Sequence, residues 1–90
     1  MPLLDLSVTE GEDAILECGI YGHPVPDISW RKNGIVIGHM LDFKQSYESG
    51  IARLVISKSC IQDYGKYSCV ATSQKGEVST SCQLTVTGWQ

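Results

Sequence analysis

The side chains that could carry out chemistry in this sequence are four cysteines, two histidines and one pair of neighbouring carboxylates. A zinc site needs close ligand pairs of the type Cys-x2-Cys or His-x3-His. Neither His23 with His39 nor Cys60 with Cys69 has such a spacing. We therefore expect no metal centre, and we interpret both histidines as solvated loop residues.

Nucleophilic and acid–base catalysis also lack a recognisable arrangement. No Gly-x-Ser-x-Gly elbow is present, and the nine glycines are spread over turns instead of forming a phosphate-binding loop. Glu10 and Glu12 flank Gly11 in what we interpret as an exposed tight turn, whereas a general acid–base pair requires a cleft. We expect a domain without catalytic residues, cofactor or small-molecule substrate, so any enzymatic activity of a parent protein would lie outside residues 1–90.

Composition indicates one small acidic domain. Ninety residues suffice for a single domain with a modest core. Seven Lys and Arg against ten Asp and Glu give a net charge of −3, which argues against a nucleic-acid or anionic-membrane surface. The apolar runs are far shorter than the roughly 20 residues that span a bilayer, and the first residues lack the features of a secretory signal. Other proteins or neighbouring domains are therefore the expected partners.

The elements that must position these side chains are strands. Ala14, Leu16, Cys18 and Ile20 alternate with other residues in the period of two that is typical of a strand with one buried face. Similar alternation elsewhere predicts strands over residues 4–9, 13–21, 27–32, 35–37, 40–45, 51–57, 65–73 and 77–87. The segment 59–65 could form one short 3₁₀ turn. Short strands separated by turn signals predict an all-β sandwich or barrel.

The sequence also contains the motifs of a known family. Cys18, Trp30 and Cys69 have the order and spacing of an immunoglobulin domain, and residues 63–69 match its D-x-G-x-Y-x-C pattern. Residues 22–34 resemble the G-x-P-x-P-x-I-x-W-x-K-x-G stretch of the intermediate set. From about residue 4 to 87 the chain therefore resembles an intermediate-set (I-set) immunoglobulin domain, of the kind found in titin, twitchin, obscurin and myosin light chain kinase.

The resemblance implies a β-sandwich of two antiparallel sheets in a Greek key, with residues 1–88 as the domain and 89–90 as a tail or the start of a linker. It further implies a set of structural residues, with Tyr67 at the tyrosine corner and Cys18–Cys69 as the potential disulfide. That set is Cys18, Trp30, Asp63, Gly65, Tyr67 and Cys69.

Three positions near the end of the chain carry separate expectations. We expect Cys82 to fill the core and Cys60 to be a surface thiol, with a Cys60–Cys82 disulfide as the less favoured alternative. Ser59 stands where family members usually carry a small apolar residue, and we expect Ile61 to fill that space.

The function implied by the resemblance is that of a non-catalytic structural and protein-interaction module in a larger intracellular muscle or cytoskeletal protein, located in the cytoplasm at the sarcomere. In this interpretation the paired segments 4–9 and 77–87 resist force. The alternative is an extracellular adhesion or receptor domain with an oxidised Cys18–Cys69 bridge. The only asparagine, Asn33, is not in a glycosylation sequon, and this absence together with two unpaired thiols favours a reducing compartment.

The apolar residues around positions 35–47 leave two interpretations open. Val36 and Ile37, with Phe43 and Tyr47, could form an exposed edge that accepts a partner strand. Alternatively Ile35, Ile37 and Phe43 point inward and close the sandwich, which is the interpretation we favour.

Overall fold

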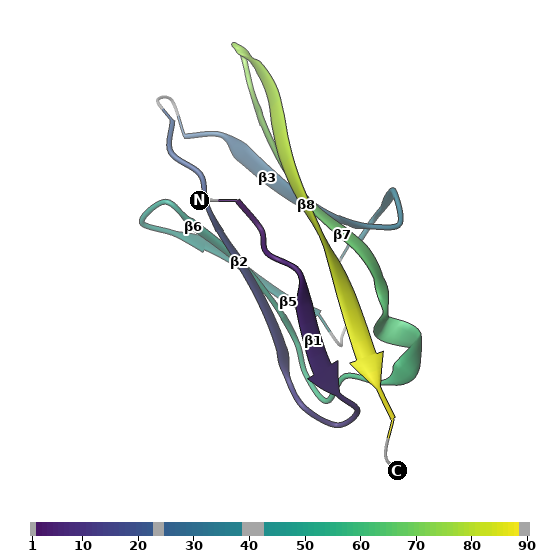
Figure 1. Ribbon diagram of the computed structural model, residues 1–90. Coiled ribbons are helices and arrows are strands. Elements are labelled where there is room, and N and C mark those ends of the chain that lie inside the picture. Colours follow the sequence, from purple (N-terminus) through teal and green to yellow (C-terminus); the bar gives the residue numbers. More distant parts are fainter. Residues whose placement is uncertain (1, 23–24, 39–42, 89–90) are drawn as a thin grey trace.

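The computed structural model describes residues 2–22, 25–38 and 43–88, and within them two sheets face each other (Figure 1). The strands are β1 (Leu6–Thr9), β2 (Ala14–Gly19), β3 (Asp27–Lys32), β4 (Ile35–Val36), β5 (Phe43–Glu48), β6 (Ile51–Ile56), β7 (Gly65–Ser73) and β8 (Gly76–Thr87). One short 3₁₀ helix, η1 (Ile61–Asp63), precedes β7, in the segment where the sequence allows such a turn. None of the helices in these described residues is long and apolar enough to cross a membrane.

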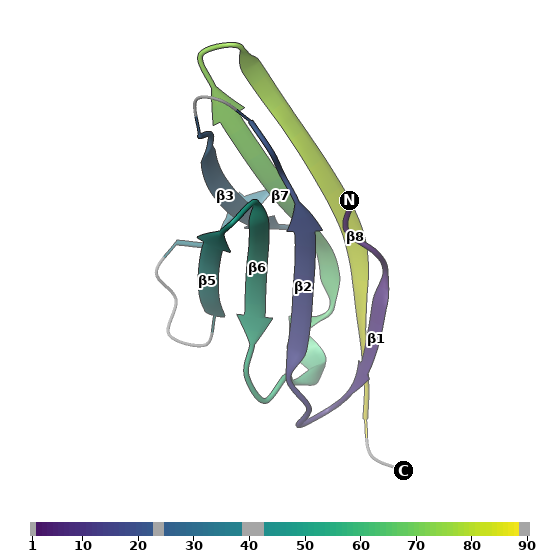
Figure 2. The same ribbon diagram turned by 90° about the vertical axis from the view of Figure 1, so that its left-hand side faces the viewer.

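The strand order confirms the predicted immunoglobulin-like sandwich. One sheet runs β1-β8-β7-β3-β4, and the facing sheet runs β2-β6-β5. Figure 2 shows the smaller sheet in front of the larger one. Within the described strands the chain changes sheet between β1 and β2, β2 and β3, β4 and β5, and β6 and β7, which is consistent with a Greek key. One pairing departs from the antiparallel expectation, because β1 pairs with β8 in parallel, from Leu6 opposite Leu84 to Thr9 opposite Thr87.

The core between the sheets is built from alternate residues of the strands. Strand β2 alternates buried and exposed positions, and β8 does so from Cys82 to Thr87. Trp30 and Tyr67 are the largest fully buried side chains. Because each inward side chain removes apolar surface from water, the period-two pattern that predicts the strands also specifies the core.

Two segments differ from the expected boundaries. The fifth strand extends from Phe43 to Glu48, where the sequence predicts 40–45, and positions 40–42 lie outside the described residues. The first strand begins at Leu6 and not at residue 4. The N–H of Leu3 donates to Oγ1 of Thr80 at 3.0 Å, so this end of the chain is attached through a side chain before the ladder starts.

The favoured interpretation of the apolar residues at 35–43 is partly wrong. Ile37 is buried and Phe43 packs partly buried against the core, but Ile35 is 73% exposed. Ile35 lies beside the turn between β3 and β4 and borders an open hollow of about 350 Å³. It does not close the sandwich because it begins the two-residue strand β4 at the edge of its sheet, where no further strand of the described residues covers it.

Candidate functional site

The six residues that the sequence singles out occupy the interior of the sandwich and one of its corners. Cys18 on β2 and Cys69 on β7 come from facing sheets, and both are fully buried. Trp30 on β3 is directly opposite Cys69 in the ladder and is 1% exposed. These three side chains are therefore part of one core cluster that joins the two sheets.

The two facing cysteines are free thiols in this structure, as are Cys60 and Cys82. Burial raises the pKa of the Cys69 thiol well above its ordinary value, and its hydrogen bond with Cys18 raises it further. Burial also raises the pKa of Cys18, although the same hydrogen bond opposes that shift. Both sulfurs are thus held protonated at neutral pH, which makes them packing groups and poor nucleophiles.

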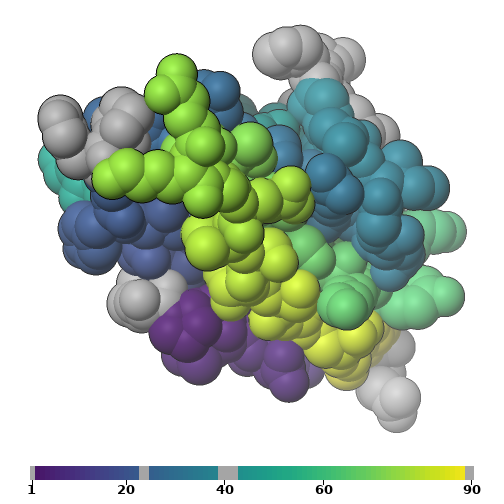
Figure 3. Space-filling view, turned by 90° about the horizontal axis from the view of Figure 1, so that it is seen from above, coloured from purple at the N-terminus to yellow at the C-terminus, as the bar shows by residue number. Residues whose placement is uncertain are grey.

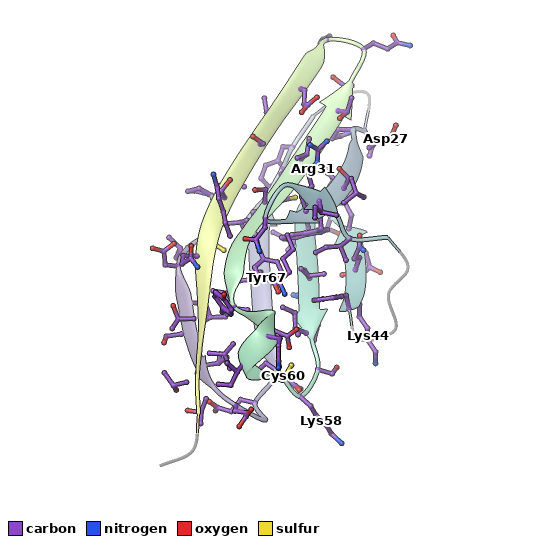
Figure 4. All side chains as sticks on the ribbon, turned by 90° about the vertical axis from the view of Figure 1, so that its right-hand side faces the viewer. Asp27, Arg31, Lys44, Lys58, Cys60 and Tyr67 are labelled. Carbon is purple, nitrogen blue, oxygen red and sulfur yellow. The ribbon has the colours of Figure 1, made fainter. Side chains whose placement is uncertain are left out.

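The corner before β7 is fixed by hydrogen bonds to the backbone. The hydroxyl of Tyr67 donates to the carbonyl oxygen of Asp63 at 2.6 Å. A carboxylate oxygen of Asp63 in turn accepts the N–H of Cys60 at 2.9 Å, which caps η1. Figure 4 shows Tyr67 between the ribbons and Cys60 beside the 3₁₀ helix. The corner is therefore a structural clamp that connects η1 to the core.

Gly65 is needed at this corner for two reasons. Its φ of +150° is rarely adopted by residues with a side chain, and an added Cβ would lie 2.9 Å from Oδ1 of Asn33. Asn33 belongs to the β3–β4 turn, and its Oδ1 accepts the N–H of Lys66 at 3.0 Å. The Asn-Gly pair predicts a turn from the sequence alone. That the Asn33 side chain also attaches this turn to the start of β7 is visible only in the structure.

Lys32 adds a contact that the sequence analysis missed. Its Nζ donates to the carbonyl oxygen of Gln62 at 2.7 Å, and the same nitrogen lies 6.0 Å from the centre of the Tyr67 ring. No spacing rule connects Lys32 to Gln62, because the two residues meet only when β3 and η1 are brought together.

The expectation that Ile61 fills the space left by Ser59 is wrong. Ile61 is 40% exposed, whereas Ser59 is 1% exposed. The Ser59 hydroxyl donates to the carbonyl oxygen of Glu12 at 2.6 Å, and the Ser59 N–H donates to the same carbonyl at 2.8 Å. A buried hydroxyl is tolerated here because it is hydrogen-bonded, so no apolar replacement is required.

The groups considered for chemistry are dispersed. Glu12 takes part in the turn after β1, where its Oε1 accepts the N–H of Thr9 at 2.7 Å. Cys60 is exposed and Cys82 is 5% exposed in the core. Among the described residues there is no group of three or more His, Cys, Asp or Glu side chains placed to hold a metal ion. His23 and His39 lie outside the described residues.

Comparison with known proteins connects this arrangement to a family. The family model described as the immunoglobulin I-set domain matches residues 1–86. Cardiac-type myosin-binding protein C of Mus musculus is 41% identical over 85 residues, which is 94% of this chain and 7% of that protein. Smooth-muscle myosin light chain kinase of Gallus gallus is 36% identical over 80 residues, which is 89% of this chain and 4% of that protein. The chain therefore spans only a small part of the length of these relatives.

A solved structure of a muscle protein also resembles this chain. The crystal structure of the titin domains Z1Z2 in complex with telethonin matches with a TM-score of 0.94 and 33% identity, over 99% of this chain and 46% of that chain. Since the family model covers nearly all of the sequence, and a relative is 41% identical over 94% of the chain, this chain belongs to the immunoglobulin I-set domain family.

Proposed function

We propose that this chain is a non-catalytic structural and protein-interaction module of a larger muscle or cytoskeletal protein, located in the cytoplasm at the sarcomere. Its sequence relatives include myosin-binding protein C and titin, which supports this class of parent protein. We take residues 1–88 as the module and residues 89–90 as the start of a linker. Partners would be proteins or neighbouring domains and not small molecules, nucleic acids or membranes.

The observation that carries the mechanical part of this proposal is the parallel pair of β1 and β8. Both strands run in the same direction (Figure 1), and the pair joins the two ends of the chain. Tension on the termini pulls β1 toward its start and β8 toward its end, so the hydrogen bonds between them are loaded together in shear. A load shared by all the bonds of a ladder resists more force than one that opens them in turn.

The direction of each N–H in β1 follows from two hydrogen bonds at the end of the strand. The N–H of Glu10 donates to the carbonyl oxygen of Thr87 at 2.7 Å, whereas the N–H of Thr9 donates to Oε1 of Glu12 and so points away from β8. Because successive N–H groups of a strand point to opposite sides, the N–H of Val8 faces β8 and the N–H of Ser7 faces away.

This geometry gives a matched test by single-molecule pulling. Val8→Pro removes an N–H that faces β8, whereas Ser7→Pro introduces the same ring one position earlier without removing such a group. Circular dichroism first establishes that both variants are folded. We then expect a clearly lower unfolding force for Val8→Pro than for Ser7→Pro. A Val8→Ala control measures the loss of the partly buried side chain. Equal unfolding forces for the two proline variants would refute the load-bearing role.

The compartment is tested by counting thiols. In protein isolated from its native source without reduction, the cytoplasmic proposal expects four reactive thiols after denaturation. Protein with two reactive thiols would instead support the extracellular alternative with an oxidised Cys18–Cys69 bridge, and protein with none would support a second, Cys60–Cys82 bridge as well.

A further inference from the structure

Strand β8 is much longer than the strand beside it. It extends from Gly76 to Thr87, but β1 pairs only with its last part, from Leu84 to Thr87. Figures 1 and 2 show β1 beside the lower part of β8, while the upper part rises with β7 as a hairpin beyond it. In the view from above, this part of β8 lies at the surface (Figure 3). The upper part of β8 is therefore a sheet edge.

The backbone groups that this edge presents can be identified by alternation. The carbonyl of Thr87 accepts from Glu10, and the N–H of Gln83 donates to Oδ1 of Asp5 at 2.8 Å, so odd-numbered residues of β8 face outward. The ladder with β7 continues without a bulge to Gly76. The outward N–H and C=O groups of residues 77, 79 and 81 have no hydrogen-bond partner within the described part of the chain.

The N-terminal segment reaches the outer side of this edge at Gln83, whose N–H donates to Oδ1 of Asp5. Its other hydrogen bond with the upper part of β8 runs from the N–H of Leu3 to Oγ1 of Thr80. The Thr80 side chain lies on the same face of β8 as buried Cys82, because the two positions share parity. The contact thus approaches from the inner face and leaves the outward backbone groups of Glu77 and Ser79 accessible.

The edge also lacks the usual protections against strand pairing. Natural edges are shortened, bulged or given lysines and prolines. Strand β4 has two residues, and the edge strand β5 carries Lys44 and Glu48. By contrast residues 77–81 contain no proline, no lysine and no bulge, and Glu77 is the single charge in a run of Val, Ser and Thr. Such a segment is well suited to accept another strand.

We propose that residues 77–81 pair in antiparallel fashion with the same segment of a second copy of this chain, about a two-fold axis between the two copies of Ser79. In this register Glu77 lies opposite Ser81, and Val78 lies opposite Thr80. All outward N–H and C=O groups of the three odd-numbered residues then meet partners. No like charges oppose each other, and the Val–Thr pairs join β-branched side chains across the strands.

Charge complementarity at the ends of the pairing favours a second copy as the occupant. The same register places Lys75, at the exposed tip of the β7–β8 hairpin, opposite Gln83 of the second copy. The N–H of Gln83 is bound by the carboxylate of Asp5, and Asp5 is exposed. Each hairpin tip therefore brings a lysine beside an aspartate of the other copy, and it does so twice because the interface is two-fold symmetric.

The test uses cysteine cross-linking that depends on the register. In a Cys60→Ser background, which removes the exposed thiol, we expect Ser79→Cys to form a covalent dimer under mild oxidation. The two Cα atoms of a hydrogen-bonded antiparallel pair are about 5.5 Å apart, within disulfide range. Glu77→Cys alone and Ser81→Cys alone should remain monomeric, but an equal mixture of these two should cross-link.

A second measurement examines the native interface without cross-linking. We expect sedimentation velocity to show the unmodified chain associating into dimers as its concentration rises. Ser79→Lys and Ser79→Glu should each be monomeric, because each places like charges opposite each other on the axis, and mixing them in equal amounts should restore the dimer. Circular dichroism confirms that each variant is folded.

Specific outcomes would overturn this inference. A chain that stays monomeric up to millimolar concentration would refute it, and would leave the edge to a strand of a different protein. Equal cross-linking of all three single-cysteine variants would indicate random collision and refute the register. The pulling experiment on β1 and β8 is independent of both results, so failure here would not affect the proposed mechanical function.

Discussion

Removing the hydroxyl of Tyr67 should weaken the domain more than removing any exposed tyrosine hydroxyl. Tyr67 is fully buried, and its hydroxyl donates to the carbonyl oxygen of Asp63 at 2.6 Å. The Tyr67→Phe variant retains the ring and its packing, so the change is confined to one hydrogen bond. Tyr64→Phe is the matched control, because Tyr64 is three residues away and 60% exposed.

The expected loss follows from the hydrogen bond and from the acceptor it leaves behind. A neutral intramolecular hydrogen bond contributes about 1 kcal/mol net, and a carbonyl left unpaired in a partly buried position adds to this. We expect Tyr67→Phe to lower the free energy of unfolding by about 1–2 kcal/mol. For a domain of this size each kcal/mol corresponds to a fall of about 4–8 °C in Tm. Tyr64→Phe should change the stability by less than about 0.5 kcal/mol.

Equilibrium denaturation in urea with an unchanged m-value measures both variants on one scale. The corner hypothesis would be refuted if Tyr67→Phe were as stable as Tyr64→Phe. A changed m-value for Tyr67→Phe would show that the substitution alters more than this one hydrogen bond.

Three further predictions concern backbone strain, a buried hydroxyl and the buried thiols. Gly65→Ala should destabilise by about 1–3 kcal/mol more than Gly76→Ala, measured by denaturation, because both glycines have positive φ but only at Gly65 would the new Cβ meet another side chain. Ser59→Ala should cost about 1 kcal/mol, since the carbonyl that accepts its hydroxyl loses one of two donors; a neutral result would contradict the role assigned to this hydroxyl. The folded state raises the pKa of Cys18 and Cys69 above the ordinary value of 9.0, so under reducing conditions the contribution of each thiol to stability is complete below pH 9 and is lost as pH rises above it. Thermal unfolding at pH 8 and pH 10 should therefore show a lower Tm at pH 10, and the fall should be smaller in a Cys69→Ala variant.

Much of the fold is determined locally, which is why the sequence predicts it. Strand positions follow from residues that alternate between water and the core, and this pattern requires no knowledge of which strand lies opposite. Cys18, Trp30 and Tyr67 are recognisable because each has a fixed place along its own strand. Their burial in the structure follows from the same alternation that predicts the strands.

The errors occur where a residue's environment depends on a distant segment. Ile35 and Ile37 share parity along the chain, yet Ile37 is buried, whereas Ile35, at the start of the two-residue edge strand β4, is exposed. Ser59 is buried because the carbonyl of Glu12, far away in the sequence, accepts its hydroxyl. Neither partner is marked by a spacing rule, so local patterns could not reveal these environments.

The sequence by itself determined the fold class, the strand positions and the side chains of the core, since these depend on local alternation and on a motif that repeats across a family. Only the tertiary structure decided that β1 runs parallel to β8 and covers just its last four residues. Pairing of strands is specified by contacts between the two ends of the chain, and no local pattern encodes how far such a ladder extends. That extent sets both the bonds that bear tension and the edge left for a second copy, so the functional surfaces follow from the packing of distant segments.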